Sequence, residues 1–274
     1  MKTNKVLLSV LIVAGVFTSA QAQQDTATLR DHDVYGPLPM QDQYYTPAKP
    51  GAPTGYFALN FGAAMPISRY ASTMPGYYGG YAMPGTALNL SGGFLFDKSN
   101  LGLAVMAGSS DNPFNENMYV SNINSAEQAN GYSATIQDYY DASSILVGVF
   151  YTIPVHHISF DLQALTGVML NRFPEVSYAA YRYDPALGTT TAYTWDIAPS
   201  TGSALAYDLG GGIRYNFGSM TVRADVNYLY GDPAYNTTEV YTEPGNNATY
   251  TILNSRIPVS LLNFTIGLGY QIGR

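Results

Sequence analysis

The sequence predicts an all-β fold: an eight-stranded antiparallel up-and-down transmembrane β-barrel with short periplasmic turns and long extracellular loops. Three observations predict it. Apolar residues alternate with small or polar residues at a period of two in eight segments, a pattern that is typical of strands. The connections between these segments are alternately short and long. The eight segments also hold only five charged residues among 96, which is fewer than a water-facing surface needs.

The composition of the 274-residue chain narrows the possible functions. It has 12 Lys and Arg, 19 Asp and Glu, and no Cys, and charged residues make up 11%, against about 25% in an ordinary soluble domain. The lack of cysteine excludes disulfides, thiol nucleophiles, cysteine-based metal sites and a lipoprotein anchor. The formal net charge of −7 argues against nucleic acid as a partner, because that requires basic patches. We expect no cofactor.

The N-terminal residues 1–22 are predicted to be a cleaved signal peptide. Lys2 and Lys5 precede an apolar run at 6–17, which is shorter than the roughly 20 residues of a membrane-spanning helix. Ala20-Gln21-Ala22 then forms a small-x-small cleavage site, so we expect cleavage after Ala22 and export of the chain.

Two regions follow the signal peptide. Residues 23–54 contain five prolines and little periodicity, which predicts an irregular periplasmic lead-in. Residues 55–274 form the predicted barrel, in which each strand places large apolar side chains on one face and mainly Gly, Ala, Ser, Thr, Asn or Gln on the other. The predicted strands are residues 56–66, 85–96, 101–109, 143–153, 158–170, 203–217, 220–230 and 259–272.

Three short connections, at 97–100, 154–157 and 218–219, set the register of the strands that they join. Closing them pairs Phe96 with Leu101, Ile153 with Ile158, and Phe217 with Met220. In each pair an apolar face meets an apolar face, whereas a slip of one residue would turn the side chains of one strand to the opposite face. Gly218 in the first position of its two-residue turn is typical of a type II′ hairpin.

The position of the charges decides which face lies inside. All five charged residues of the strands fall on the face that carries the small and polar side chains. That face suits the narrow interior of an eight-stranded barrel, which side chains just fill. The opposite face carries Phe, Tyr, Leu, Ile and Val, as a lipid-facing surface with aromatic girdles does. The pattern therefore favours a membrane barrel over a soluble barrel or sandwich.

Over residues 55–272 the chain resembles the small eight-stranded outer-membrane barrels of the OmpA-like and OmpX-like kind. The most similar stretches are 207–217 (YDLGGGIRYNF), 222–228 (VRADVNY) and the alternating apolar residues of the last strand. Ile272 stands where the family has a terminal aromatic residue. The resemblance implies residence in the outer membrane of a Gram-negative-type bacterium, with outer-membrane lipid and the barrel insertion machinery as partners.

The five interior charges form the first candidate site, a polar network of Asp161, Asp208, Arg214, Arg223 and Asp225. The 218–219 turn places Arg214 opposite Arg223, and two facing guanidinium groups in a confined interior need carboxylates. The favoured interpretation is a network of ion pairs that fills and rigidifies the barrel. The alternative is a gate in a narrow conduction path, and the OmpA-like resemblance, which implies interior ion pairs, fits both.

Other candidates are weaker. His157-x-Ser159 resembles the motif of lipid A deacylase barrels, but it lies at a short turn, and Ser159 points inward by parity. His156 and His157 lack a third metal ligand. The Asp-rich segment 110–142 matches no calcium loop and is interpreted as a solvated acidic surface. We therefore expect neither a metal site nor a catalytic site.

The long loops at 171–202 and 231–258 are the remaining functional surface. Both are predicted to be hairpins that extend the barrel beyond the membrane, and tyrosine-rich surfaces make good binding platforms. Their aromatic residues are Tyr178, Tyr181, Tyr183, Tyr193, Trp195, Tyr241 and Tyr250. The leading function is a structural or surface-interaction role in which the loops meet an unidentified extracellular ligand. The alternative is a narrow porin-like channel, and the third possibility is a lipid-modifying enzyme.

Overall fold

The computed structural model describes residues 55–74, 79–96, 99–127, 133–136, 139–184, 188–243 and 245–272. The predicted signal peptide and lead-in lie outside the described residues. No helix in these ranges is long and apolar enough to cross a membrane.

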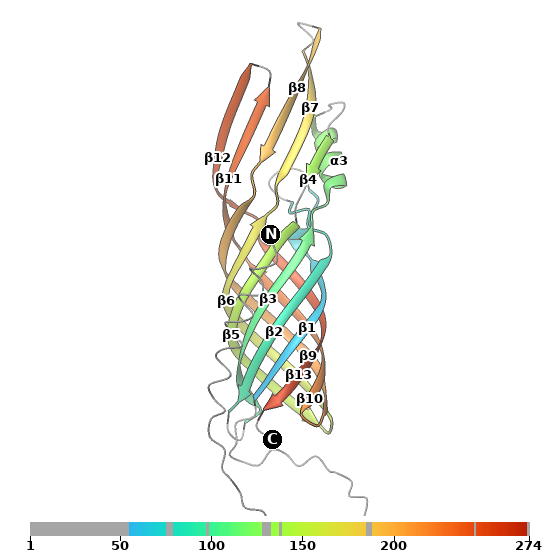
Figure 1. Cartoon of the computed structure of the whole chain (residues 1–274), viewed down its shortest axis with the longest axis vertical. Coiled ribbons are helices and arrows are strands. Elements are labelled where there is room, and N and C mark those ends of the chain that lie inside the picture. Colours follow the sequence, from blue (N-terminus) through green and yellow to red (C-terminus); the bar gives the residue numbers. More distant parts are fainter. Residues whose placement is uncertain are drawn as a thin grey trace, which may run out of the picture. The chain divides into compact units, whose positions relative to one another are not determined.

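Eight antiparallel strands close into a barrel (Figure 1). The strands are β1 (Gly55–Pro66), β2 (Gly85–Leu95), β3 (Leu101–Pro113), β5 (Tyr139–Val155), β6 (Ile158–Phe173), β9 (Ser200–Phe217), β10 (Met220–Gly231) and β13 (Val259–Ile272). Each of these strands pairs with the barrel strand that precedes it and the one that follows it in the sequence. The first strand, β1, pairs with the last, β13, and this closes the cylinder. The structure confirms all eight predicted strands, several of which run further at the end that carries the long connections.

The registers agree with two of the three predicted turns. Phe217 pairs with Met220 across the Gly218–Ser219 turn, where Gly218 has a φ of 64°. The Phe96 backbone N donates to the Leu101 backbone O at 2.9 Å, as the predicted pairing requires. Both turns lie at the end of the barrel where β1 begins and β13 ends. We call this the short-turn end.

The predicted pairing of Ile153 with Ile158 is wrong, because Ile153 pairs with Phe160. Strand β5 continues through Pro154, whose fixed φ is compatible with extended backbone, and only His156 and His157 form the turn. His156 adopts the positive φ, 57°, that such two-residue turns need. The shift is an even number of residues, so the same faces still meet.

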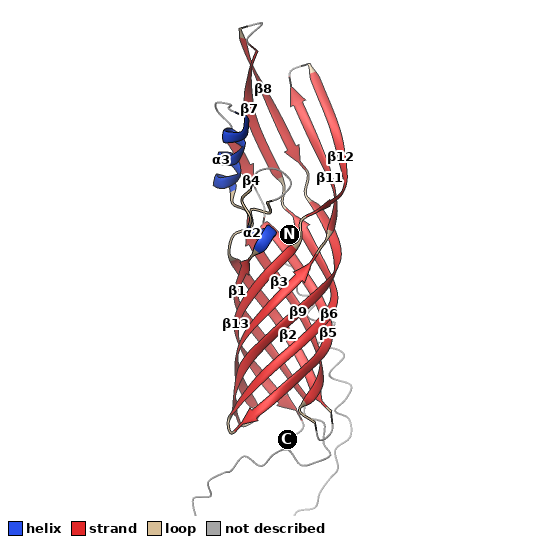
Figure 2. Cartoon of the chain, turned by 180° about the vertical axis from the view of Figure 1, so that it is seen from behind, coloured by secondary structure: helices blue, strands red, loops and turns tan. Residues whose placement is uncertain are grey.

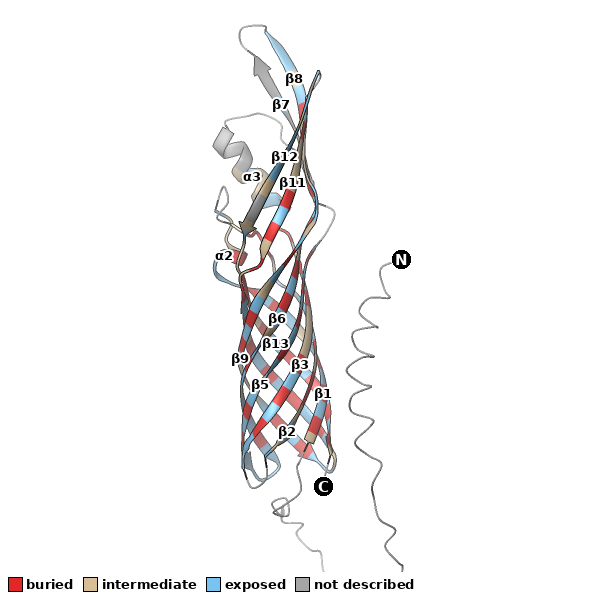
Figure 3. Cartoon of the chain, turned by 90° about the vertical axis from the view of Figure 1, so that its left-hand side faces the viewer, coloured by how far each residue is buried: buried red, intermediate tan, exposed pale blue. Residues whose placement is uncertain are grey.

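Large apolar side chains cover the outside of the barrel. Ile266 is 68% exposed and Phe61 is 63% exposed, whereas Arg223 is 3% exposed. Exposed and buried residues alternate along each strand (Figure 3). Since this is the reverse of a soluble protein, the outer surface requires lipid, and the barrel is a transmembrane one.

The interior is fuller than the sequence predicted. The inward face, which the prediction described as small and polar, also carries large buried side chains: Tyr56, Met106, Leu146, Phe150, Leu165, Met169 and Leu229. Tyr140, from the predicted long connection 110–142, belongs to β5 and is buried as well. A short helix, α2 (Ser68–Ala71), lies at the barrel end opposite the short turns (Figure 2). Its Tyr70 is fully buried, with its ring 5.0 Å from that of Tyr140. The Tyr140 hydroxyl donates to the Gly80 backbone O at 2.7 Å, so the segment after β1 is fixed to the barrel interior.

The sheet continues beyond the barrel at the long-connection end, where β11 pairs with β9, and its outer strands follow the order β4-β7-β8-β11-β12. These outer strands are β4 (Ser133–Ile136), β7 (Val176–Asp184), β8 (Thr189–Ile197), β11 (Ala234–Glu243) and β12 (Asn246–Arg256). The predicted hairpins are confirmed as β7–β8 and β11–β12 (Figure 1). The helix α3 (Glu116–Glu127), which was not predicted, lies beside this sheet (Figure 2). We call the five strands and α3 the extension.

Candidate functional site

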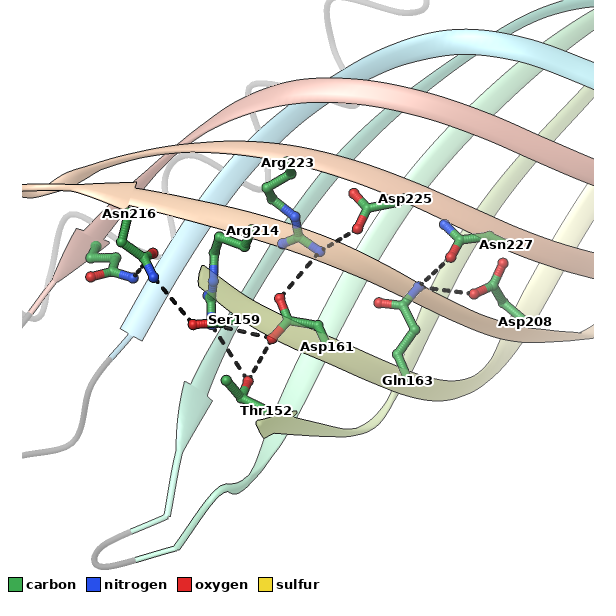
Figure 4. A network of polar contacts seen from close by, with 11 residues as sticks. Thr152, Ser159, Asp161, Gln163, Asp208, Arg214, Asn216, Arg223, Asp225 and Asn227 are labelled. Carbon is green, nitrogen blue, oxygen red and sulfur yellow. Dashed lines mark hydrogen bonds and ion pairs between the residues drawn. The ribbon is translucent and has the colours of Figure 1, made fainter. Parts of the chain in front are cut away.

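Four of the five predicted interior charges meet near the short-turn end (Figure 4). Arg214 Nη2 lies 3.2 Å from Asp161 Oδ1, and Arg223 Nη2 lies 3.0 Å from Asp225 Oδ1. A second contact of 4.0 Å joins Arg223 to Asp161 Oδ2. Asp161 therefore bridges the two arginines, and the Thr152 hydroxyl also donates to it at 2.7 Å.

The arginines face each other as the turn predicted, with Arg214 opposite Arg223 in the register of β9 and β10. An aromatic ring that the sequence analysis missed lies beneath both. The guanidinium carbons of Arg214 and Arg223 are 5.5 and 5.0 Å from the centroid of the Tyr56 ring. A desolvated cation is attracted to such a ring face. The parity of β1 could have revealed Tyr56, because it shares its face with Ala58 and Asn60.

Asp208 lies apart from this cluster. Its Oδ1 accepts from Gln163 Nε2 at 3.0 Å, and the same amide donates to Asn227 Oδ1 at 3.2 Å. In the strand register Asp208 stands between Leu165 and Leu229. No ion pair joins it to either arginine among the residues that the structure describes. The geometry therefore gives a bridged group of two arginines and two aspartates, with Asp208 in a separate amide-bonded position.

The residues of the His-x-Ser motif do not come together. The His157 ring lies at the turn, 6.4 Å from the ring of Tyr215 on the outer face. Ser159 is buried, and its hydroxyl accepts from Asn216 Nδ2 at 3.1 Å. A histidine outside the barrel cannot remove a proton from a serine inside it, so this pair forms no hydrolytic arrangement. Within the described ranges no group of three or more His, Asp or Glu residues is placed to hold a metal ion.

The predicted loop aromatics form a stacked cluster across the four longer strands of the extension. The Trp195 ring is nearly parallel to those of Tyr178 and Tyr250, at 6.2 and 5.9 Å between centroids. It meets the Tyr241 ring edge-on at 5.5 Å, and Tyr241 lies 5.4 Å from Tyr193. We call these five residues the aromatic cluster. Aromatic pairs in these geometries add stability beyond the area that they bury.

Contacts at its edges hold the aromatic cluster in place. Trp195 Nε1 donates to Glu239 Oε2 at 3.1 Å, and Val120 of α3 packs against the cluster. Partial burial raises the pKa of the Glu239 carboxyl above its usual value, and the hydrogen bond from Trp195 offsets part of that rise. Of the other two predicted aromatics, Tyr181 is 55% exposed, and the side chain of Tyr183 lies outside the described residues.

The closed eight-stranded barrel, its apolar outer surface and its charged interior define a small outer-membrane β-barrel protein. Among solved structures, the chain is similar to a major outer membrane protein from Thermus thermophilus, at 15% identity and a TM-score of 0.42, with 80% of this chain and 99% of that chain covered. It is also similar to Ail, the attachment invasion locus protein of Yersinia pestis, at 13% identity and a TM-score of 0.37, with 82% and 100% covered.

A third similar structure is Neisserial surface protein A, at 12% identity and a TM-score of 0.38, with 80% of this chain and 96% of that chain covered. No protein-family model and no curated protein sequence matches this chain. With similarities this low, the class of protein follows from the strand pairing and the inside-out distribution of apolar residues in the structure itself.

Proposed function

We propose that the barrel anchors the extension, and that the extension is a binding surface on the outside of the cell. The aromatic cluster carries this proposal, because it locks four strands into one ordered platform above the barrel. Binding to a preformed surface avoids the cost of ordering loops. Tyrosine and tryptophan also supply large contact areas at a small loss of side-chain entropy.

The filled interior supports a structural role for the barrel. Tyr70 and Tyr140 are both fully buried at the end next to the extension, and Leu146 and Met169 are fully buried further along the interior. Near the short-turn end, the bridged arginines and aspartates occupy the lumen of the barrel. A path for ions would require both groups of side chains to move. The alternative of a narrow channel is therefore the weaker one.

The orientation is part of the same proposal. A signal peptide cleaved after Ala22 would deliver the chain to the periplasm, and residues 23–54 would lead from there into β1. Because β1 begins and β13 ends at the short-turn end, that end would face the periplasm. The extension would then stand outside the cell, where a partner can reach it.

A pair of surface-display strains tests this function. One strain produces the full chain, and the other produces a variant in which β7–β8 and β11–β12 are each replaced by a two-residue turn. Cells of both strains are applied to wells coated with purified glycans, extracellular-matrix proteins or envelope fractions. We expect adhesion to at least one coating that the shortened variant lacks, with equal amounts of heat-modifiable barrel in both strains. Equal adhesion of both strains on every coating would refute the proposed role of the extension.

A further inference from the structure

The strands of the extension have two faces with different chemistry. Tyr178 stands opposite Trp195, and Trp195 stands opposite Tyr241, so the aromatic cluster lies on one face, where Val120 of α3 packs against it. Side chains alternate along a strand, so the residues between these aromatics point to the other face. We call it the threonine face, and its members include Ser177, Ala179, Tyr181, Ala192, Thr194, Asp196, Val240, Thr242, Asn247 and Thr249.

One row of the threonine face crosses four strands. Ala179 of β7 stands opposite Thr194 of β8, Thr194 opposite Thr242 of β11, and Thr242 opposite Asn247 of β12. Neighbouring strands lie about 4.8 Å apart, so the row spans about 14 Å. Thr242 and Asn247 are exposed, and Thr194 is half-buried. The row therefore presents a line of uncharged hydroxyl and amide groups to the solvent.

A depression of about 420 Å³ lies on this row, at the small end of the range for ligand pockets, about 300–1,000 Å³. Tyr181, which stands opposite Ala192, borders it and is 55% exposed. The methyl groups of Ala179 and Ala192 are too small to cover the tyrosine ring. The side chains that line the depression from the threonine face are those of Ala179, Tyr181, Ala192, Thr194, Thr242 and Asn247.

These groups match a ligand that combines apolar C–H surface with hydroxyl groups. The face of the Tyr181 ring carries partial negative charge and attracts C–H groups. Threonine hydroxyls and the Asn247 amide both donate and accept hydrogen bonds, as a hydroxyl-bearing ligand requires. Asp196 lies on the same face and accepts from the Ser177 hydroxyl, and a carboxylate has room for further hydroxyl donors. A sugar ring has an apolar face bordered by hydroxyl groups and therefore fits this lining.

The charges around the depression exclude anionic ligands. The four long connections, 67–84, 110–142, 171–202 and 231–258, contain eleven acidic and four basic residues, and such a field repels sulfated or phosphorylated chains. Among the described residues that line the depression, none is a lysine or an arginine, the residues that bind such anions. A folded protein partner would need several apolar anchors at the centre of its interface, whereas the depression offers one large ring.

We propose that the threonine face binds an uncharged oligosaccharide that belongs to a surface opposite the cell. This proposal rests on the proposed function, because it names the class of partner that the extension would hold. One sugar ring packs on Tyr181, and hydroxyl groups of the oligosaccharide bond to the row of Thr194, Thr242 and Asn247. The depression lies toward the ends of the hairpins, away from the barrel (Figure 1), where glycans of an opposing surface arrive first.

A set of immobilised oligosaccharides tests the site. Biotinylated hexasaccharides of glucose, mannose, galactose and N-acetylglucosamine are the neutral probes, and a heparin hexasaccharide is the anionic one. Biolayer interferometry measures binding of the full folded chain in a zwitterionic detergent that contains no sugar, at physiological ionic strength. We expect at least one neutral probe to bind and the heparin probe to remain free. Lipopolysaccharide from the producing strain should not compete.

Three substitutions locate the binding. Tyr181→Ala should weaken it about five- to tenfold, as the loss of an aromatic contact does, whereas Tyr181→Phe keeps the ring and should stay within about twofold. Tyr139→Ala is the matched control, because Tyr139 is 56% exposed but belongs to β5, and it should leave affinity unchanged. Heat-modifiable migration and Trp195 emission check that all three variants fold.

The site is refuted if none of the neutral probes binds, if heparin binds more tightly than they do, or if Tyr181→Ala and Tyr139→Ala weaken binding equally. Competition by lipopolysaccharide would refute the choice of an opposing surface. None of these results changes the adhesion of the full chain to protein coatings, compared with that of the hairpin-shortened variant. A failure of the oligosaccharide site is thus distinguishable from a failure of the proposed function.

Discussion

Replacing Asp161 by Asn is predicted to destabilise the barrel more than any other loss of an interior carboxylate. Asp161 lies 3.2 Å from Arg214 and 4.0 Å from Arg223, and all three side chains are almost fully buried. Removing one partner of a buried ion pair costs roughly 3–5 kcal/mol, because the other charge is left uncompensated. Asp161→Asn leaves Arg214 without a carboxylate, so we expect a loss of unfolding free energy in that range.

Two other aspartates provide the comparison. Asp225→Asn removes the 3.0 Å contact with Arg223 but leaves Asp161 beside the same guanidinium, so we expect a smaller loss of about 1.5–3 kcal/mol. Asp232 pairs with Arg256 at 2.9 Å, but both side chains are well exposed. Asp232→Asn should therefore cost about 0–1 kcal/mol.

Urea unfolding of the barrel in phospholipid vesicles, followed by far-UV circular dichroism, measures the three losses. A fourth variant tests the mechanism. Replacing Asp161 with Leu and Arg214 with Met together should recover most of the stability, since a well-packed apolar pair replaces a buried ion pair at little cost. If Asp161→Asn is no more destabilising than Asp225→Asn, or if the double replacement is as unstable as Asp161→Asn, the bridging role of Asp161 is refuted.

Three further predictions test other parts of the account. An epitope tag in the β11–β12 turn should be stained by antibody on intact cells, whereas a tag in the β9–β10 turn should be stained only after the outer membrane is permeabilised; the opposite pattern would invert the proposed orientation. Gly212→Ala should impair folding, measured by the heat-modifiable fraction on gels, because its Cβ would lie 2.0 Å from Asp225 Oδ1, whereas Gly211→Ala meets no atom closer than 3.2 Å and should be tolerated better. The emission of Trp195 should titrate with an apparent pKa above the ordinary glutamate value of about 4.3, and Glu239→Gln should abolish that transition. Since the folded pKa is raised, the extension should lose stability as pH rises through it.

The sequence was sufficient to predict the strands and the inward face, for a physical reason. A strand buried on one side repeats every two residues, and a short turn transfers that parity from one strand to the next. The Gly218–Ser219 turn therefore predicted that Arg214 faces Arg223. No short turn links Asp161 to Arg214, because β6 and β9 are joined through the long segment 174–199. Their mutual register depends on closure of the whole barrel, which the sequence pattern does not specify.

The alternating pattern of the sequence did not predict the interior packing or the helix α3, for other reasons. The inward face was described by its commonest residues, so single large side chains such as Leu146 and Phe150 were overlooked although their parity was correct. Tyr70 lies in a connection that has no periodicity. Helix α3 has a polar sequence, and contacts such as that of Val120 with the aromatic cluster support it. Helices of this kind depend on tertiary packing more than on their own sequence.

Single-channel recording in planar bilayers tests the central claim most directly, namely that the barrel is a filled scaffold for the extension. The sample is the full chain, with folding verified by its heat-modifiable migration. We expect no conductance above that of the bare bilayer, because aromatic and aliphatic side chains fill one end of the barrel interior and the bridged arginines and aspartates fill the other. A discrete and reproducible conductance that changes in Asp161→Asn would contradict it and would make the interior network the gate of a pore.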